Sequence, residues 1–282
     1  MINLKSYAKI NLYLHINGQK DNYHILDSLF SYIELYDLIS IASISAENHI
    51  INTNYELNNK ENLIYKVLIN FLALYKIKEK FYITHHKSVP MAAGMGGGSS
   101  NAACIINFLY DYFSIEVSLS EKINFALKFG ADIPFFLTNY SRYVSGIGEI
   151  LNDKTTYPKI PLLIINPKTQ IKTKDVFAAF SKQSFSNKMK IYPTKFENKK
   201  ALLEFLANTK NDLTDIALEK DQKLANIYNY INQDKYFIRL TGTGPTCFII
   251  AKDSHDLNVL YNDLKAKFVD YLILKSNMLA EI

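Results

Sequence analysis

The residues with the clearest chemical potential are glycines gathered in one short stretch. The chain has only ten glycines in 282 residues, and four of them lie in the sequence PMAAGMGGGSSNAA, at positions 94, 96, 97 and 98. At an average usage of about 7%, a chain of this length would hold roughly twice as many glycines. Glycines cluster where the backbone needs a positive φ, or where another group must approach the main chain closely.

The residues after these glycines are typical of the start of a helix. The N–H groups of a glycine-rich turn and the positive end of the helix dipole together attract an anion. The hydroxyls of Ser99 and Ser100 are suited to a phosphate or to Mg²⁺. This is not a Walker A loop, because no lysine follows the last glycine, and Ser99 stands where a Rossmann loop has its third glycine. We therefore predict a phosphate-binding loop of another type, called the glycine loop below, rather than a flexible surface loop.

Two charged residues stand in otherwise apolar stretches. Asp132 lies in GADIPFF, where a carboxylate is costly to bury unless it is paired. From the residues alone, a catalytic role and a helix-capping or structural role for Asp132 are equally open. Lys9 lies in YAKINLYL, where the common alternative is a lysine that faces outward from a strand. Asn11 is two residues further on and therefore projects to the same strand face as Lys9.

The periodicity of apolar residues predicts the elements that position these groups. Strands are expected over residues 4–16, 29–44, 80–90 and 162–167, and on both sides of a second glycine loop within residues 237–253. Helices are expected over residues 62–77, 99–113, 118–130, 200–208 and 212–232. The second helix should begin at a serine or asparagine, and the third should be capped by Ser118 or Ser120 and end at Gly130. The turn-rich stretch 151–161 predicts a boundary between a domain at 1–154 and a domain at 155–282.

Composition narrows the class of protein. No apolar run is long enough to span a bilayer and no signal peptide is evident, so we expect a cytoplasmic protein without a membrane partner. The net charge of +5 is spread along the chain and is too small to predict nucleic-acid binding. Cys104 and Cys247 lack the spacing of a disulfide framework or a zinc site and fit a reducing compartment. His85 and His86 should point to opposite faces of a strand, which makes them a poor chelating pair.

Four motifs, in order over nearly the whole chain, resemble those of the GHMP kinases, the family named for galactokinase, homoserine, mevalonate and phosphomevalonate kinases. The motifs are AKINLYLHI with NYHILDSLF, PMAAGMGGGSSNAA, GADIPFFL with GIGEIL, and RLTGTGPTCF. The resemblance implies an α+β fold of two domains with the active site in the cleft between them. The N-terminal domain would be like domain 2 of ribosomal protein S5, and the C-terminal domain would be ferredoxin-like. The implied reaction is phosphoryl transfer from ATP, with Mg²⁺, to an alcohol, which requires positioning, charge neutralisation and a base for the hydroxyl proton.

The resemblance also implies roles for particular residues. Asp132 would be the general base, and Lys9 would lie beside it, keep it ionised and stabilise the developing alkoxide. The residues expected to bind ATP are Pro90, Met91, Ala92, Ala93, Gly94, Met95, Gly96, Gly97, Gly98, Ser99, Ser100, Asn62 and Lys87. Those expected to bind the second substrate are Asn11, Tyr23, His24, Thr173 and Phe177. Those expected to close over the active site from the second domain are Thr241, Gly242, Thr243 and Gly244.

Within the family, the triple glycine followed by SSNAA looks most like one branch. The substrate of that branch is a cytidine diphosphate-linked methylerythritol, phosphorylated on its 2-hydroxyl on the methylerythritol phosphate route to isoprenoids. Tyr23 and His24 would recognise the cytosine ring, and Phe177 would stack on it. The chain departs from this branch at Asn22, where glycine is usual, and at Lys174, where proline is common.

Two alternatives are open. One is another GHMP kinase that acts on homoserine or a mevalonate derivative, which Tyr23 and His24 disfavour because those substrates carry no base. The other is a nucleotide-binding regulator of the same fold that has lost catalysis, which the presence of both Lys9 and Asp132 disfavours. The expected partners are small molecules alone, with the chain a monomer or a weak homodimer.

Overall fold

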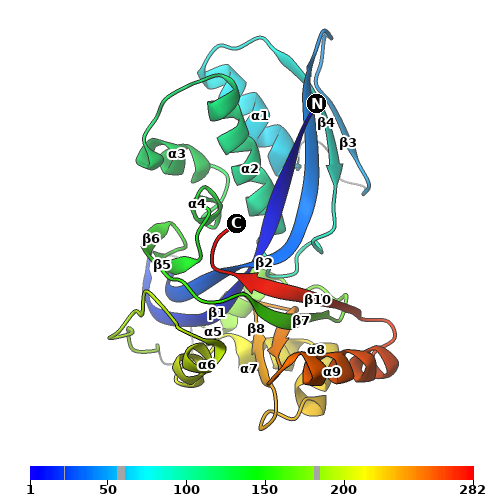
Figure 1. Cartoon of the computed structure of the whole chain (residues 1–282). Coiled ribbons are helices and arrows are strands. Elements are labelled where there is room, and N and C mark those ends of the chain that lie inside the picture. The colour runs from blue at the N-terminus through cyan, green and yellow to red at the C-terminus, as the bar shows by residue number, and fades with distance from the viewer. Residues whose placement is uncertain (22, 56–60, 181–184) are drawn as a thin grey trace. The chain divides into compact units, whose positions relative to one another are not determined.

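The computed structural model describes residues 1–21, 23–55, 61–180 and 185–282 (Figure 1). It contains two compact units, each built from segments that are distant in the sequence. Unit 1 comprises Met1–Ala8, Leu35–Met91 and Gly96–Asn139, and unit 2 comprises Lys9–Glu34, Ala92–Met95 and Tyr140–Ile282. The paired strands β1 (Ile2–Lys20) and β2 (Tyr23–Ile44) contribute residues to both units. The sequence predicts two continuous domains that meet between residues 154 and 155, whereas these units are built from interleaved segments. The domain boundary stays a prediction.

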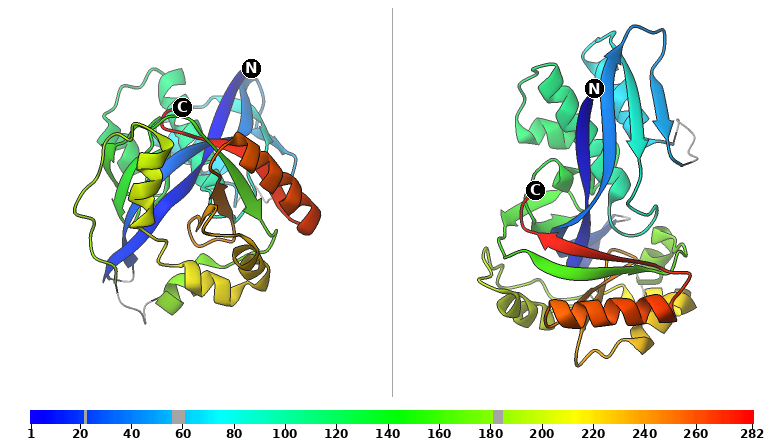
Figure 2. Two further views of the ribbon diagram at one scale, coloured as in Figure 1. Left: turned by 60° about the horizontal axis from the view of Figure 1, so that its bottom comes forward. Right: turned by 45° about the vertical axis from the view of Figure 1, so that its right-hand side comes forward.

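Unit 1 combines strands with a group of helices. Besides parts of β1 and β2, it holds β3 (Ile50–Thr53), α1 (Leu63–Leu74), β4 (Lys80–His86), α2 (Gly97–Tyr112), α3 (Leu119–Ala126) and α4 (Ile133–Phe136). Strand β4 is antiparallel to β2 and parallel to β3. Helices α1 and α2 lie side by side, as Figures 1 and 2 show, and pack against each other. The expected apolar face of α1 is buried, at Ile64, Val67, Leu68, Phe71 and Leu72.

Unit 2 is a larger sheet with helices. Its strands, besides parts of β1 and β2, are β5 (Arg142–Gly146), β6 (Ile150–Lys154), β7 (Ile160–Asn166), β8 (Phe237–Leu240), β9 (Cys247–Ile250) and β10 (Leu272–Leu279). Its helices are α5 (Thr173–Phe180), α6 (Lys199–Ala207), α7 (Thr214–Lys220), α8 (Gln222–Tyr230) and α9 (Ser254–Lys267). Strands β10, β7, β9 and β8 are antiparallel neighbours in that order, and α9 packs on β7 and β10 (Figure 2). The mixture of elements confirms the α+β expectation.

Three helix boundaries differ from the sequence expectation. Helix α2 begins at Gly97, and its N-cap is Gly96 at φ 66° rather than a serine or asparagine, because the chain enters the helix through a left-handed turn. Helix α3 has the expected cap at Ser118 but ends at Ala126, before Gly130. The run 212–232 is divided at Asp221, whose extended backbone ends α7 and whose carboxylate accepts hydrogen bonds from the first N–H groups of α8.

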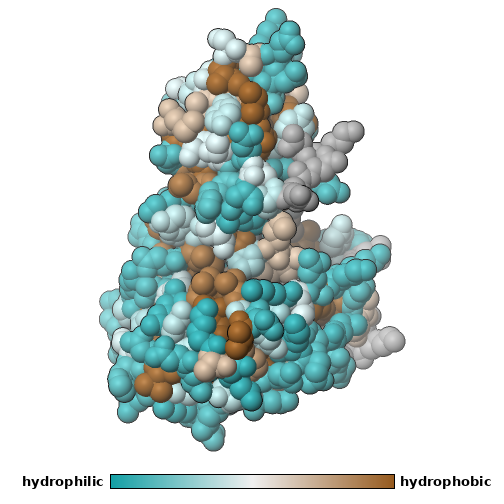
Figure 3. All heavy atoms as spheres, turned by 90° about the vertical axis from the view of Figure 1, so that its right-hand side faces the viewer, coloured by the Kyte–Doolittle hydropathy of each residue, from teal (hydrophilic) through white to brown (hydrophobic). Residues whose placement is uncertain are grey.

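The face drawn in Figure 3 is mostly hydrophilic, and its hydrophobic residues form small groups. Scattered apolar side chains of this kind are ordinary on protein surfaces. Among the residues that the structure describes, no helix has the length and hydrophobicity needed to cross a membrane.

Candidate active site

The glycine loop has the unusual backbone that its composition predicts. Ala92, Gly94 and Gly96 all have positive φ, at 50°, 72° and 66°. A side chain at Gly94 would collide with the carbonyl oxygen of Thr241, so the close approach of two backbones requires glycine there. A side chain at Gly97 would lie 3.0 Å from Cγ1 of Val89 and 3.2 Å from Nζ of Lys87. The backbone conformation or the neighbouring atoms of the protein therefore explain why positions 94, 96 and 97 are glycine.

Neither the backbone nor a close neighbour among the described residues explains the glycine at position 98. It is exposed in the first turn of α2, and a Cβ atom there would meet only Cδ1 of Leu63, at an ordinary 3.6 Å, among the described residues. Glycine within a helix costs up to about 1 kcal/mol relative to alanine. The absence of a side chain at Gly98 is therefore not explained by contacts within the described protein. It leaves space for a ligand beside the N–H groups at the N-terminus of α2, which has no side-chain cap.

The two serines of the loop differ in what they offer a ligand. The Ser100 hydroxyl is buried, donates to the carbonyl oxygen of Tyr7 at 2.7 Å and accepts from the hydroxyl of Ser6 at 2.7 Å. It is therefore engaged within unit 1, which weighs against the expected contact with phosphate or Mg²⁺. Ser99 is half-buried and remains the hydroxyl that suits a ligand.

The remaining loop residues and Asn62 have mixed exposure. Met91 is exposed and Pro90 half-buried, whereas Ala93 and Met95 are buried. Asn62 is buried at the N-terminus of α1, where its Oδ1 accepts a hydrogen bond from the N–H of Ile64 at 2.9 Å. Asn62 therefore has a capping role that is independent of any nucleotide.

Lys87 belongs to a buried polar cluster that sequence reasoning missed. Its Nζ donates to Oδ2 of Asp37 at 2.7 Å, and the Asp37 carboxylate is fully buried. Burial alone would raise the pKa of Asp37, but a hydrogen bond from His85 and the charge of Lys87 lower it well below its usual value. The available signal was a single aspartate within the apolar strand sequence SYIELYDLISI. As expected, His85 and His86 differ in their surroundings, since His85 is buried and His86 is exposed.

Lys9 and Asn11 share a strand face, as their spacing predicts. Lys9 is 3% exposed, so the alternative of an outward-facing lysine is wrong. Its Nζ donates to Oδ1 of Asn11 at 2.7 Å and lies 4.3 Å from the ring centre of Phe30. Burial of an ammonium group is costly without such polar and aromatic partners.

The second glycine loop packs against this pair and against the first glycine loop. Asn11 Oδ1 accepts hydrogen bonds from the hydroxyl of Thr241 at 3.2 Å and the N–H of Gly242 at 2.9 Å. The Thr241 hydroxyl also lies 3.1 Å from the carbonyl oxygen of Gly94. Thr241–Gly244 form the tight turn between β8 and β9, with Thr243 Oγ1 3.2 Å from Oγ1 of Thr173. Their expected closure over the active site stays a prediction.

The residues expected to bind the nucleobase line one cavity of unit 2. The cavity has a volume of about 400 Å³ and is lined by Gln19, Tyr23, His24, Leu26, Ile147, Lys174, Phe177 and Ala178. The rings of His24 and Phe177 stack with centres 5.1 Å apart, and Tyr23 is exposed at the rim. Nε2 of His24 is buried without a hydrogen-bond partner among the described residues, and burial lowers the pKa of His24. Asn22 lies outside the described residues.

Asp132 is the N-terminal residue before α4, in unit 1, and is half-buried. Its side chain makes no capping hydrogen bond to that helix, which weakens the capping explanation. Its role as a general base stays a prediction, as does the expected pairing with Lys9, which belongs to unit 2.

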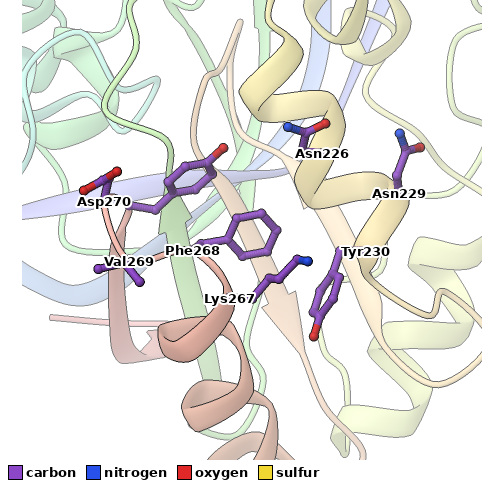
Figure 4. A pocket seen from close by; sticks show the side chains of 8 residues that line it. Asn226, Asn229, Tyr230, Lys267, Phe268, Val269 and Asp270 are labelled. Carbon is purple, nitrogen blue, oxygen red and sulfur yellow. The ribbon is translucent and has the colours of Figure 1, made fainter.

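A second cavity in unit 2 has none of the predicted site residues in its lining (Figure 4). It has a volume of about 640 Å³ and is formed by the end of α8 and the segment that joins α9 to β10. The asparagines that line it, Asn226 and Asn229, are exposed, as is Lys267. It therefore resembles an open surface depression rather than a built binding site.

Comparison with known proteins gives the family. Residues 62–140 match the family model for the N terminal domain of GHMP kinases, and residues 196–270 match the model for the C terminal domain. A 4-diphosphocytidyl-2-C-methyl-D-erythritol kinase of Clostridium botulinum is 32% identical over 281 residues, which cover 98% of this chain and 100% of that protein. The enzyme of the same name from Francisella philomiragia is 33% identical over 277 residues, with coverage of 97% and 96%.

Solved structures agree on the fold. A crystal structure of 4-(cytidine 5'-diphospho)-2C-methyl-D-erythritol kinase has a TM-score of 0.80 at 24% identity and covers 98% of this chain and 99% of its own. A mevalonate kinase from Methanococcus jannaschii has a TM-score of 0.68 at 17% identity, with coverage of 99% and 98%. These matches confirm the expected two-domain kinase fold. With relatives above 30% identity over nearly the whole chain and both family domains present, the chain belongs to the GHMP kinase family.

Proposed function

We propose that the chain transfers the γ-phosphoryl group of ATP to the 2-hydroxyl of 4-(cytidine 5'-diphospho)-2-C-methyl-D-erythritol, on the methylerythritol phosphate route to isoprenoids. The relatives that match it over nearly their full length carry the name of that kinase. Mevalonate and homoserine kinases share the fold at 11–18% identity, which supports no choice of substrate. The cytidyl substrate is therefore favoured over the other GHMP substrates.

The observation that carries the nucleotide part of this proposal is Gly98. No contact among the described residues calls for a glycine there, whereas a phosphate beside the N–H groups of α2 would need the space that a Cβ atom fills. Lys87 Nζ lies close to the neighbouring Gly97 and adds positive charge at the same helix end. Backbone donors, the helix dipole and a cation together suit a triphosphate.

Magnesium is part of the proposal. No group of three or more His, Cys, Asp or Glu side chains among the described residues could hold a metal ion. The Ser99 hydroxyl is the group in the loop that fits as a single ligand. In this proposal Mg²⁺ would arrive bound to ATP and would neutralise phosphate charge.

For the chemical step we assign the proton to Asp132. The substrate hydroxyl oxygen forms a bond to the γ-phosphorus as the bond from that phosphorus to the bridging oxygen breaks, and the hydroxyl proton passes to the Asp132 carboxylate. Lys9 would stabilise the negative charge on the attacking oxygen. Asn11 accepts hydrogen bonds from Lys9 and Gly242. We therefore assign it two roles, which are to position Lys9 and to contact the substrate.

The cavity that contains Tyr23, His24 and Phe177 supports recognition of a cytosine ring. An aromatic pair offers faces on which a base can stack, and the buried Nε2 of His24 is a polar atom that a base edge could satisfy. Cytoplasmic location, small molecules as the only partners, and a monomer or weak homodimer belong to the same proposal.

The test is an ATP-consumption assay of the purified chain with the cytidyl substrate, homoserine and mevalonate side by side. We expect turnover with the cytidyl substrate alone. In His24→Ala, the KM for that substrate should rise by about tenfold or more, because loss of one base contact costs about 1–3 kcal/mol, while the KM for ATP stays unchanged. Strong turnover of homoserine or mevalonate would favour the other kinases, and no turnover in a chain that binds ATP would favour the regulator.

A further inference from the structure

Asp37, in unit 1, is a residue with no assigned role whose carboxylate accepts several hydrogen bonds. Its Oδ1 accepts hydrogen bonds from the N–H groups of Ser88 and Val89, both at 2.8 Å. Its Oδ2 accepts from Lys87 Nζ at 2.7 Å and from Nδ2 of Asn101 at 3.0 Å. Nε2 of His85 lies 3.4 Å from the same oxygen. Hydrogen bonds to a buried charged group are stronger than those between neutral groups.

These partners occupy particular places in the chain. Lys87, Ser88 and Val89 form the turn that leads from β4 into the glycine loop, and Asn101 lies in the second turn of α2, just after the loop. One carboxylate of β2 therefore holds the chain on both sides of the loop. A loop whose ends are held in this way loses less conformational freedom when a ligand binds.

The same carboxylate orients a cation toward the helix end. The Lys87 side chain is 11% exposed, and a Cβ atom at Gly97 would lie only 3.2 Å from its Nζ. Nζ is therefore at the first turn of α2 with one N–H directed to Asp37. An ammonium group has three donors, so the remaining N–H groups can serve an anion at the helix N-terminus.

We propose that Asp37 is a positioning residue for ATP, which fixes the two ends of the glycine loop and holds the Lys87 ammonium group beside the first turn of α2. The inference rests on the proposed use of ATP and names a residue that acts through others rather than on the substrate. A purely structural role for Asp37 is the competing explanation, since removal of one member of any buried ion pair destabilises a protein.

The chain contains a matched control for that explanation. Asp27, in unit 2, is also buried and accepts hydrogen bonds from the hydroxyl of Tyr13 at 2.8 Å, the hydroxyl of Tyr192 at 2.7 Å and the N–H of Met189 at 3.3 Å. It has a similar number of donors but none from the glycine loop. Asp27→Asn should therefore lower the melting temperature and leave the ATP affinity unchanged.

The experiment measures ATP binding to the full chain by calorimetry, beside thermal melts, in the wild type, Asp37→Asn, Lys87→Met, the double variant and Asp27→Asn. We expect Asp37→Asn and Lys87→Met each to weaken ATP binding by about tenfold or more. The double variant should be little weaker than the weaker single variant, because residues that act as a unit give non-additive losses. A folded Asp37→Asn that binds ATP like the wild type, or an equal loss in Asp27→Asn, would overturn the proposal.

A milder change covers the case in which Asp37→Asn does not fold. Asn101→Ser removes one donor to Asp37 and should weaken ATP binding about threefold, whereas unchanged affinity in folded Asn101→Ser and Lys87→Met also overturns the proposal. Because ATP binding is measured without an acceptor, the result does not depend on which alcohol the chain phosphorylates. A wild type that binds ATP but leaves the cytidyl substrate unchanged would defeat the proposed reaction and leave this inference standing.

Discussion

Lys87 in unit 1 and Lys9 in unit 2 each donate a hydrogen bond of 2.7 Å, but the acceptors differ. In unit 1, Lys87 donates to the carboxylate of Asp37. In unit 2, Lys9 donates to the amide oxygen of Asn11. A carboxylate holds a lysine by an ion pair as well as by a hydrogen bond, whereas an amide contributes the hydrogen bond alone. The difference indicates that Asp37 and Lys87 form a charged framework beside the glycine loop and that Asn11 orients the Lys9 ammonium group.

The other partners of the two acceptors agree with this division. Asp37 gathers main-chain N–H groups and an amide from segments next to the glycine loop. Asn11 Oδ1 accepts from Thr241 and Gly242 as well as from Lys9, and its Nδ2 donates to Ser28. We therefore expect changes around Asp37 to act on ATP binding and changes around Asn11 to act on the chemical step.

The largest expected effect is a fall in kcat when the positive charge of Lys9 is removed. Lys9→Met should lower kcat by about 10²–10⁴, with small changes in both KM values, because its charge acts on the developing alkoxide. Asp132→Asn should give a loss of the same order, since it removes the base, and the double variant should be little worse than the worse single one. Steady-state kinetics beside a thermal melt decide the matter. Turnover of folded Asp132→Asn within a few-fold of the wild type would remove the general-base role.

A second change tests the amide itself. Asn11→Asp keeps the shape of the side chain but places a carboxylate against Lys9, which makes unit 2 resemble unit 1. We expect kcat to fall about thirtyfold while the KM for ATP stays near that of the wild type, because the added negative charge opposes the action of Lys9 on the attacking oxygen without displacing its side chain. Kinetics across pH would measure it. If Asn11→Asp is as active as the wild type, the charge of Lys9 does not act in the reaction.

Substitution of two glycines, one in each unit, tests the assignment of the glycine loop. A side chain has space at Gly98 but would collide with the backbone at Gly94. Gly98→Ala has room in unit 1 and should raise the free energy of unfolding by about 0.5–1 kcal/mol, yet weaken ATP binding about tenfold by filling the ligand's space. Gly94→Ala is the control, because its Cβ would collide with the Thr241 carbonyl and should destabilise unit 2. Denaturant unfolding and calorimetry measure both properties. Unchanged ATP affinity in Gly98→Ala would contradict the phosphate assignment.

Much of this site follows from local sequence, and the remainder depends on contacts between distant segments. The glycine loop before a helix and the common strand face of Lys9 and Asn11 follow from composition and from the two-residue period of a strand. The cluster around Asp37 could not be predicted, because its partners at Ser88 and Asn101 are 51 and 64 residues away. The contact of Asn11 with Thr241 spans 230 residues.

Other features that the sequence does not reveal have similar physical causes. The hydroxyl of Ser100 is engaged with Tyr7 and Ser6, which a local pattern does not show, and its expected contact with ATP stays a prediction. A side-chain cap was expected for α2, but the chain enters this helix at positive φ and uses Gly96. Helix periodicity located α1 well because its buried face alone decides the pattern.

The smallest expected effect is a difference between Asp37 and Asn11 in how their contribution to the free energy of unfolding depends on pH. The folded pKa of Asp37 lies below the unfolded value of about 3.8, so its stabilising effect is complete above pH 4 and is lost as pH falls. The difference in unfolding free energy between the wild type and Asp37→Asn should therefore shrink below pH 4, by about 1 kcal/mol per pH unit. Asn11 does not titrate, so the difference between the wild type and Asn11→Ala should stay constant over the same range. Urea unfolding at pH 7, 5, 4 and 3 measures both differences, and a gap for Asp37→Asn that does not change with pH would show that its carboxylate is not stabilised by Lys87 and the other donors.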